Sequence, residues 1–296
     1  MKCLYYPGCS QKATASVYEQ ALMAIAPHLG LELSELDDWN CCGATLVPAV
    51  NKVLALSLSA RNLALAERQQ GDAVLLTPCP SCSLNLTKAH ETLTERNART
   101  EKVRHALAQG GLEYKGGVKV RHLLEFLLNT VGLERIRAAI KKPLSGLRVA
   151  PYYGCQVVRP HTVGDDPSNP QNLEKLITAL GAEPAPFPMR TACCGGALVA
   201  TQPDVGDRLV GSILDSIHRA EATAIVTPCS LCQVTLEMAA RRREPRAKRL
   251  PTLNIAQLVG LALGLDEKEI GIGRLLVPRA SLKALQAVRT GTQASM

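Results

Sequence analysis

Aromatic residues and long apolar runs are both scarce in this sequence. Phe, Trp and Tyr make up 3% of the 296 residues, so the bases of a single-stranded nucleic acid would find few rings to stack on. No segment has the length and hydrophobicity of a membrane-spanning helix, and the N-terminal residues are too polar for a signal peptide. We therefore expect a cytoplasmic protein with no transmembrane segment and no nucleic-acid partner.

Two common cofactor motifs are also missing. The CxxCxxCxxxCP run of cubane ferredoxin modules does not occur, and no GxGxxG motif follows a predicted strand. We therefore expect no flavin and no NAD site in this chain. Electrons for any redox chemistry would have to come from a partner protein.

Acidic residues are in deficit, and the excess positive charge is concentrated in one segment. The net charge is +8. Only Glu244 opposes the basic residues of a segment that we call the basic segment, which comprises Arg241, Arg242, Arg243, Arg246, Lys248 and Arg249. A solvated helix end is the simpler interpretation. A surface that attracts an acidic partner or an anionic substrate is the alternative.

Cysteine, in contrast, is abundant, and all of the eleven cysteines except Cys3 follow a pattern that occurs twice. Each copy has a single cysteine, an adjacent pair followed by glycine, and a CxxC motif. The first cysteine set is Cys9, Cys41, Cys42, Cys79 and Cys82, and the second cysteine set is Cys155, Cys193, Cys194, Cys229 and Cys232. Because cytoplasmic thiols stay reduced, such sets indicate metal or redox chemistry rather than disulfides.

The number of cysteines in each set favours iron–sulfur chemistry over zinc. Each set has one cysteine more than a tetrahedral zinc site needs, whereas a cluster with several irons can use all five thiolates. A lone CxxC could be a redox dithiol, but both CxxC motifs recur with CCG at similar distances. Cys3 is expected to be a small buried residue, and His161 a solvated loop residue, with substrate contact as the alternative.

The cysteine sets lie within a longer repeat of strands and helices. Residues 2–9 resemble 148–155, and 73–79 resemble 224–229, each reading as an apolar strand that ends just before a cysteine. Apolar residues at helical spacing fill the intervals, at 13–29, 50–70, 172–180 and 204–220. This alternation predicts an α/β fold with two pseudo-twofold-related domains, each a parallel sheet flanked by helices.

The same repeat predicts where the domains and their sites lie. We expect a first domain at 1–143, a second at 144–265 and a basic C-terminal tail at 266–296. Because ligands of open parallel sheets gather at the carboxyl ends of the strands, each cysteine set should assemble there. Cys82 and Cys232 should fall in the first turn of a helix, where the dipole favours a thiolate. Gly43, Gly195 and Gly196 should let the backbone pass close to an inorganic core.

The double arrangement of single cysteine, CCG and CxxC resembles the CCG-domain family, and its two-copy form resembles the B subunit of heterodisulfide reductase. The resemblance covers residues 1–265. It implies that each set binds one noncubane [4Fe-4S] cluster through its five cysteines, with zinc in one of the two sites as the alternative. It also implies that the clusters themselves are catalytic, with no side chain needed as acid or base.

This resemblance implies an oxidoreductase of sulfur metabolism that makes or cleaves disulfide or sulfane-sulfur bonds. We expect the iron–sulfur subunit of a heterodisulfide reductase-like complex in sulfur oxidation, with a substrate bound to a lipoyl carrier. The partners implied are a small C-type subunit with cubane clusters, an A-type flavoprotein subunit and a lipoate-binding carrier protein. The alternatives are the B subunit of coenzyme M–coenzyme B heterodisulfide reductase, and a CCG-domain electron-transfer subunit of a lactate or glycolate oxidase.

Overall fold

Two parallel β-sheets with the same strand order organise the chain in the computed structural model, which describes residues 1–160 and 165–276. The first sheet has the order β2-β1-β3-β4 and consists of β1 (Lys2–Tyr5), β2 (Glu32–Glu35), β3 (Val74–Thr77) and β4 (Lys119–His122). The second has the order β6-β5-β7-β8 and consists of β5 (Arg148–Pro151), β6 (Glu183–Pro184), β7 (Ala224–Thr227) and β8 (Thr252–Asn254). All neighbouring strands pair in parallel. This confirms the predicted α/β fold.

Equivalent residues of the two sheets follow from their registers. In the first sheet Tyr5 pairs with Leu76, and the N–H of Tyr6 donates to the carbonyl of Leu76. In the second sheet Pro151 pairs with Val226, and the N–H of Tyr152 donates to the carbonyl of Val226. Tyr6 and Tyr152 therefore occupy the same position just beyond the first strand of each sheet.

The chain forms two compact units that interleave along the sequence. Unit 1 consists of residues 1–14 and 31–123, and unit 2 consists of residues 15–30 and 124–296 as far as they are described. The predicted domain ranges, 1–143 and 144–265, follow the repeat in the sequence. The packing assigns residues 15–30 and 124–143 to the unit that contains the second sheet.

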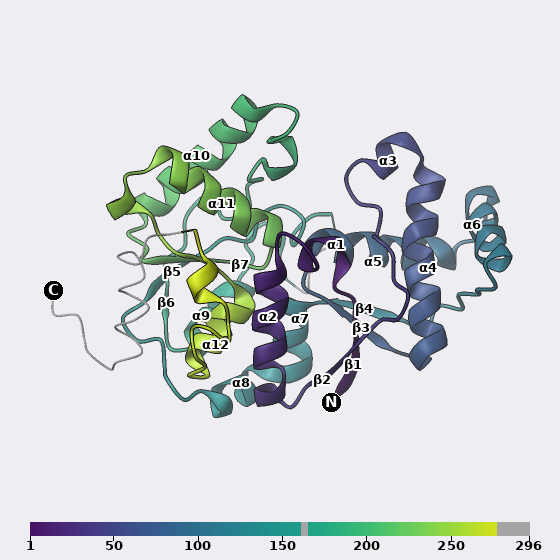
Figure 1. Ribbon diagram of the computed structural model, residues 1–296, viewed down its shortest axis with the longest axis horizontal. Coiled ribbons are helices and arrows are strands. Elements are labelled where there is room, and N and C mark those ends of the chain that lie inside the picture. The colour runs from purple at the N-terminus through teal and green to yellow at the C-terminus, as the bar shows by residue number, and fades with distance from the viewer. Residues whose placement is uncertain (161–164, 277–296) are drawn as a thin grey trace. The chain divides into compact units, whose positions relative to one another are not determined.

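The helices of unit 1 begin at residues that suit helix starts. They are α1 (Gly8–Gln11), α3 (Val47–Val50), α4 (Lys52–Gln70), α5 (Pro80–Thr94) and α6 (Ala98–Gln109). The side chain of Asn51 accepts the N–H groups of Val53 and Leu54 at the start of α4, as favoured N-cap residues do. Pro80 occupies the first position of α5, where its missing N–H costs nothing. In Figure 1, α4 runs beside α5 and α6 and packs on both.

The helices of unit 2 include a segment from the N-terminal part of the chain. They are α2 (Ser16–Ile25), α7 (Leu123–Phe126), α8 (Leu133–Ala139), α9 (Asn172–Ala179), α10 (Pro203–Arg219), α11 (Ser230–Arg243) and α12 (Ile255–Ala262), with a π-helical turn at Leu127–Gly132. Helix α2 lies beside α12 (Figure 1). The helix axes can approach closely because Gly260 of α12 has no side chain where it faces Ile25 and Ile270.

A buried apolar core supports each sheet. The core of unit 1 includes Leu4, Leu63, Leu75, Leu86 and Val120, all buried. The core of unit 2 includes Ala150, Ile213, Leu214, Ile225 and Leu236. In both units the core also includes two cysteines of the local set, so the packing of the core fixes one side of each site.

Candidate functional site

The cysteines of the first set come from three loops beyond the strands of the first sheet. Cys9 lies in α1, directly after β1, and the pair Cys41–Cys42 lies in the loop between β2 and α3. Cys79 is the N-cap residue of α5, and Cys82 lies in its first turn. The loop after each of three strands therefore supplies part of the set, as predicted from the position of the cysteines.

The sulfurs of the first set lie close together. The Sγ atoms of Cys9 and Cys41 are 3.9 Å apart, and those of Cys42 and Cys82 are 3.6 Å apart. Cys41 interacts with Cys42, and Cys79 interacts with Cys82, through their side chains. The structure thus brings all five predicted residues together.

The first set has a buried side and an open side. Cys42 and Cys82 are 2% and 3% exposed, whereas Cys9 and Cys41 are exposed and Cys79 is intermediate. A group held by these five thiols would rest against the core of unit 1 through Cys42 and Cys82. Its opposite side, at Cys9 and Cys41, would face solvent.

The second set repeats this arrangement in unit 2. Cys155 follows β5, Cys193 and Cys194 follow β6, Cys229 is the N-cap residue of α11, and Cys232 lies in its first turn. The Sγ atoms of Cys194 and Cys232 are 3.5 Å apart, and Cys155 interacts with Cys193. Cys194 and Cys232 are buried, and Cys193 is exposed. Both sets thus have the same buried pair and the same open side.

One cysteine of each buried pair favours the thiolate. The hydrogen bond from the Cys41 thiol, with that from Cys82, lowers the pKa of Cys42 to about 3. The hydrogen bond from the Cys232 thiol lowers the pKa of Cys194 to about 6. The prediction that the first-turn cysteines Cys82 and Cys232 favour thiolates is wrong in this structure. Their pKa values are raised, first by their hydrogen bonds to Cys42 and Cys194 and further by burial, and these effects exceed that of the helix dipole.

Two glycines that the sequence analysis did not single out make room for the sulfurs. Gly8 has a φ of +70°, and a Cβ atom there would lie 2.8 Å from Sγ of Cys82. Gly154 also has a φ of +70°, and its Cβ atom would lie 3.0 Å from Sγ of Cys232. Both contacts are shorter than side-chain carbons tolerate, so each cysteine set needs glycine before its single cysteine.

The predicted glycines after the paired cysteines have mixed roles. A Cβ atom at Gly195 would lie 2.9 Å from the Cα atom of Gly206, so this glycine lets α10 cross the loop closely. Gly43 similarly lies against Ala55 of α4. At Gly196 a Cβ atom would lie 3.3 Å from Sγ of Cys194, so this residue does allow a close approach to a sulfur.

A buried tyrosine supports the CCG loop of each unit, and the sequence analysis missed it. The hydroxyl of Tyr6 donates to the carbonyl of Asn40 at 2.7 Å, directly before Cys41. The hydroxyl of Tyr152 donates to the carbonyl of Ala192 at 2.8 Å, directly before Cys193. Burial, with the nearby cysteines, raises the pKa of both hydroxyls far above the usual range, so both remain donors. The repeated Tyr-Tyr of the sequence was the available signal.

The donor set fits an iron–sulfur group by its chemistry. Five soft thiols converge in each unit, and the glycines described above leave space beside the buried sulfurs. Within residues 1–160 and 165–276, no group of three or more His, Cys, Asp or Glu side chains is placed to hold a single metal ion. The residues that would hold a cluster are thus the two sets already named.

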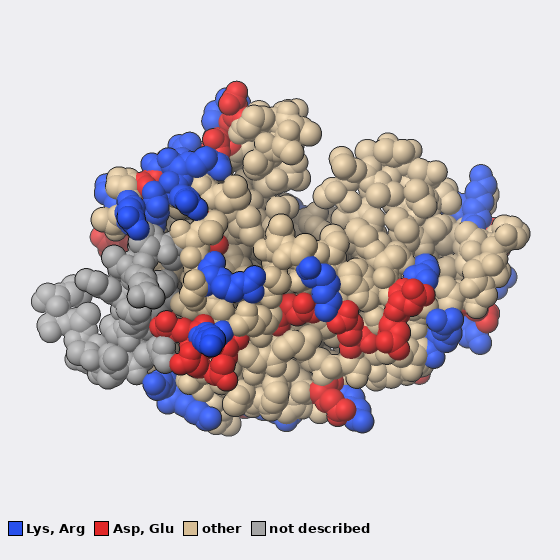
Figure 2. Space-filling view, in the orientation of Figure 1, with Lys and Arg blue, Asp and Glu red and all other residues tan. Residues whose placement is uncertain are grey.

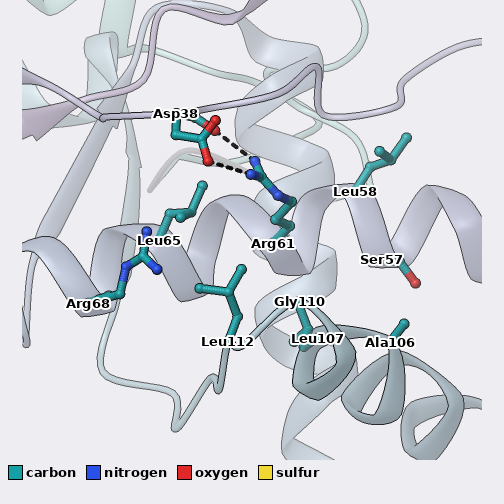
Figure 3. Close-up of a pocket in the computed structure, with 10 residues that line it drawn as sticks. All are labelled: Asp38, Ser57, Leu58, Arg61, Leu65, Arg68, Ala106, Leu107, Gly110 and Leu112. Atoms are coloured by element: carbon teal, nitrogen blue, oxygen red, sulfur yellow. Dashed lines mark hydrogen bonds and ion pairs between the residues drawn. The ribbon is translucent and has the colours of Figure 1, made fainter.

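A separate cavity of 360 Å³ opens between α4 and α6 (Figure 3). Figure 3 shows Arg61 reaching from α4 to Asp38, with Leu65 and Leu112 on the wall below. The guanidinium of Arg61 donates to the Asp38 carbonyl at 2.7 Å and to Oδ1 of Asn40 at 3.0 Å. The cavity contains no cysteine of the set, but Arg61 links its wall to the residue before Cys41.

The basic segment lies at the end of α11 and in the turn that follows. Figure 2 shows Lys and Arg side chains gathered over this end of the helix. Part of the charge is neutralised or tied to the backbone. Arg242 pairs with Asp207 at 2.6 Å, and Arg249 donates to the carbonyls of Glu244 and Arg241. The geometry fits the simpler interpretation, a solvated helix end.

Three further predicted features have different outcomes. Cys3 is 2% exposed and lies in β1, and burial raises its pKa to about 11, which confirms a packing role. His161 lies outside the described residues, as does the tail from residue 277 onward. The described part of the tail is anchored, because Arg274 donates to Oγ of Ser16 at 2.8 Å and to Gln20 at 3.2 Å.

These observations define a class of protein with two cysteine-rich α/β units, and the chain belongs to the CCG cysteine-rich domain family, which it matches at residues 3–87 and 149–237. It is 38% identical to the 8-methylmenaquinol:fumarate reductase membrane anchor subunit of Wolinella succinogenes, over 94% of this chain and 98% of the relative. It is 34% identical to a protein of Archaeoglobus profundus described as like the B subunit of heterodisulfide reductase, over 92% and 93%.

A third relative is the B subunit of the ferredoxin:CoB-CoM heterodisulfide reductase of Methanosarcina mazei, with 29% identity over 92% of each chain. These similarities confirm the resemblance to the B subunit of heterodisulfide reductase. A crystal structure of a hypothetical protein from Helicobacter pylori has a TM-score of 0.73 at 15% identity, over 93% of this chain and 51% of that one, which supports the fold alone. In the described parts of the chain, none of the helices is long and apolar enough to cross a bilayer.

Proposed function

We propose that each cysteine set binds one noncubane [4Fe-4S] cluster and that the chain is the iron–sulfur subunit of a heterodisulfide reductase-like oxidoreductase in the cytoplasm. The ligands would be Cys9, Cys41, Cys42, Cys79 and Cys82 for one cluster, and Cys155, Cys193, Cys194, Cys229 and Cys232 for the other. The observation that carries this proposal is the convergence of five thiols at equivalent places in both units. A structural zinc site would not need the fifth thiol.

The open side of each set supports a role in chemistry on a substrate. Cys9 and Cys41 are exposed in unit 1, and Cys193 is exposed in unit 2, so a substrate sulfur could approach without any movement of the core. The buried pair of each set would hold the group rigidly from the other side. When bound, two clusters would supply one electron each, and cleavage of a disulfide takes two electrons.

Residues of the chain itself would contribute binding and order rather than proton transfer. Tyr6 and Tyr152 hold the CCG loops through hydrogen bonds. Thr77 and Thr227 accept the N–H groups of Cys79 and Cys229 at 3.5 and 3.3 Å, and so orient the two CxxC turns. Because the thiolates are fixed in this way, little rearrangement is needed when the oxidation state changes.

We further propose that the substrate is a disulfide or sulfane sulfur on a lipoyl carrier and that the complex acts in sulfur oxidation. The partners would be a small cubane-cluster protein, a flavoprotein and the lipoate-binding carrier. Support comes from the similarity to the B subunits of heterodisulfide reductases. The coenzyme M–coenzyme B heterodisulfide is the alternative substrate.

A second candidate function is electron transfer within a quinol:fumarate reductase. The observation that favours it is the identity of 38% to an 8-methylmenaquinol:fumarate reductase membrane anchor subunit over nearly the full length of both chains. In this case the clusters would pass electrons between partner proteins and would not bind a sulfur substrate.

Anaerobic purification followed by iron, sulfide and zinc analysis tests the cluster proposal. About eight irons per chain are expected for two four-iron clusters, whereas a protein dominated by zinc contradicts the proposal. The substrate proposals are separated by spectroscopy of the reduced protein. A change in the cluster spectrum on addition of lipoamide disulfide, but not of fumarate, supports disulfide chemistry. Co-purification with a fumarate reductase flavoprotein and no spectral response to disulfides supports the second candidate.

A further inference from the structure

The two cysteine sets are alike in their backbone donors. The N–H of Gly43 donates to Cys41, and the N–H of Ala44 donates to Cys42. In the second set, the N–H of Gly195 lies 3.4 Å from Sγ of Cys193, and the N–H of Gly196 lies 3.4 Å from Sγ of Cys194. Hydrogen bonds from the backbone therefore give the two sets the same support.

The side-chain donor to the buried thiolate differs between the sets. Three residues after the CxxC motif, unit 1 has Asn85 in α5 and unit 2 has Thr235 in α11. Nδ2 of Asn85 lies 3.8 Å from Sγ of Cys42. Thr235 contacts Cys194 from the equivalent position. The same place in the fold thus holds an amide in one unit and a hydroxyl in the other.

The amide and the hydroxyl are not equivalent as donors. The amide of Asn85 has two N–H groups and can donate to Cys42 without giving up another bond. A hydroxyl has one proton, and Oγ1 of Thr235 donates it to the carbonyl of Leu231 at 2.8 Å. Thr235 can donate to Cys194 only when it breaks this bond within its own helix. Cys42 therefore receives a side-chain hydrogen bond that Cys194 largely lacks.

Hydrogen bonds to a ligand sulfur favour the reduced cluster, because they stabilise the additional negative charge that reduction places on the sulfurs. We propose that Asn85 and Thr235 set the two clusters at different reduction potentials, so that the cluster on the first cysteine set is reduced first. This inference rests on the proposed function, since it needs a cluster in each set. Asn85 and Thr235 would be positioning residues that act through the sulfurs of Cys42 and Cys194.

The experiment is a redox titration of the anaerobically purified protein, followed by electron paramagnetic resonance. Cys82→Ser and Cys232→Ser variants, each expected to lose one cluster, assign the signals to the two sets. In the wild-type protein, the signal of the first set should appear at the higher potential. One equivalent of reductant should therefore reduce the first set before the second.

Matched substitutions test the donors themselves. Asn85→Leu keeps the volume and removes the donor, and should shift only the first cluster to a lower potential. Asn85→Thr copies the residue of unit 2 and should bring the two potentials together, and Thr235→Asn should raise the second. Thr235→Val removes the hydroxyl with little change in shape and should move the second potential only slightly.

Each result bears on one of the two proposals. Coincident potentials in the wild type, or a first potential that stays the same in both Asn85→Leu and Asn85→Thr, overturn the inference while the two clusters remain established. A protein without iron overturns the proposed function, and this inference with it. If Asn85→Leu fails to retain its cluster, the order of reduction in the wild type and the Thr235→Asn shift still decide the question.

Discussion

Replacing Gly8 with alanine tests whether the space beside the buried sulfurs is needed for a cluster. Gly8 has a φ of +70°, in the left-handed region. An added Cβ atom would lie 2.8 Å from Sγ of Cys82. The substitution therefore imposes two separable penalties, one on the backbone and one on the position of the sulfur.

The backbone penalty for alanine in the left-handed region is about 1–2 kcal/mol. The contact is the larger effect, because nonbonded atoms at optimal separation are about 3.5–4.0 Å apart and the sulfur would have to retreat by roughly 0.7–1 Å. Ligands of a functional site must stay within about 0.5 Å of their productive positions. We therefore expect Gly8→Ala to lose the cluster of the first set and to leave that of the second in place.

The assay is iron content together with the visible and electron paramagnetic resonance spectra of anaerobically purified variants. Gly71→Ala is the matched control, because Gly71 has a φ of +66° and no atom would lie within 4 Å of its Cβ atom. Both variants should lose similar stability, but only Gly8→Ala should lose about half of the iron. Equal iron content in Gly8→Ala and Gly71→Ala would refute the reasoning, since backbone strain alone would then account for both.

Three other predictions concern ligands, loop support and pH. Cys42→Ser replaces a soft ligand with a harder one and should abolish or distort the local cluster, whereas Cys3→Ser should keep its iron; normal spectra in Cys42→Ser would exclude the five-ligand proposal. Tyr152→Phe should destabilise the protein by about 1–3 kcal/mol in urea unfolding and Tyr6→Phe by only about 0.5–1.5, because the Asn40 carbonyl keeps a second donor, Asn62; the reverse order would contradict this. Burial raises the pKa of Glu237 from 4.5 to about 8, so its contribution to stability is full below pH 4.5 and is lost as the pH rises to about 8. Glu237→Gln should flatten this fall, which is at most about 1.4 kcal/mol per pH unit; an unchanged slope in unfolding experiments would argue against a buried proton.

The ligand-bearing features could be predicted because they leave strong signals in the sequence. The ten paired cysteines recur at similar spacing, and the strands before Cys79 and Cys229 are apolar runs that end at Thr-Pro-Cys. Strands β2 and β6 gave no comparable signal. They are short and largely exposed, so they lack the apolar pattern that identifies a buried strand.

The interleaving of the two units could not be predicted from the sequence. Helix α2 has an apolar face, and an apolar face says that a helix packs but not on which sheet. Its neighbours in the structure are α12 and the segment around Ile270, more than two hundred residues away in the chain. Tyr6, Asn85 and Thr235 were missed for a related reason. They are ordinary residues in their local sequence, and their roles depend on which loop the fold places opposite them.

The supports of the two CCG loops differ in a way that predicts which cluster is held less firmly. In unit 1 the loop before Cys41 is fixed by Asn62, which is 0% exposed. Its side chain donates to the carbonyl of Asn40 at 2.9 Å and accepts the N–H of Asn40 at 2.9 Å. In unit 2 the corresponding loop receives a bond from Arg159 to the carbonyl of Thr191. Arg159 is exposed, so water competes with this bond.

Because buried hydrogen bonds are costly to break and exposed ones are not, the loop of unit 2 should open more often. We expect an iron chelator to remove the cluster of the second set first, in two resolved phases under anaerobic conditions. Asn62→Leu removes both bonds of the first loop at similar volume, and should speed the slow phase toward the fast one. Arg159→Gln is the matched change in unit 2 and should alter the fast phase only slightly. A slow phase that is assigned to the second set, or that Asn62→Leu leaves unchanged, would show that the buried amide does not control access to the first site.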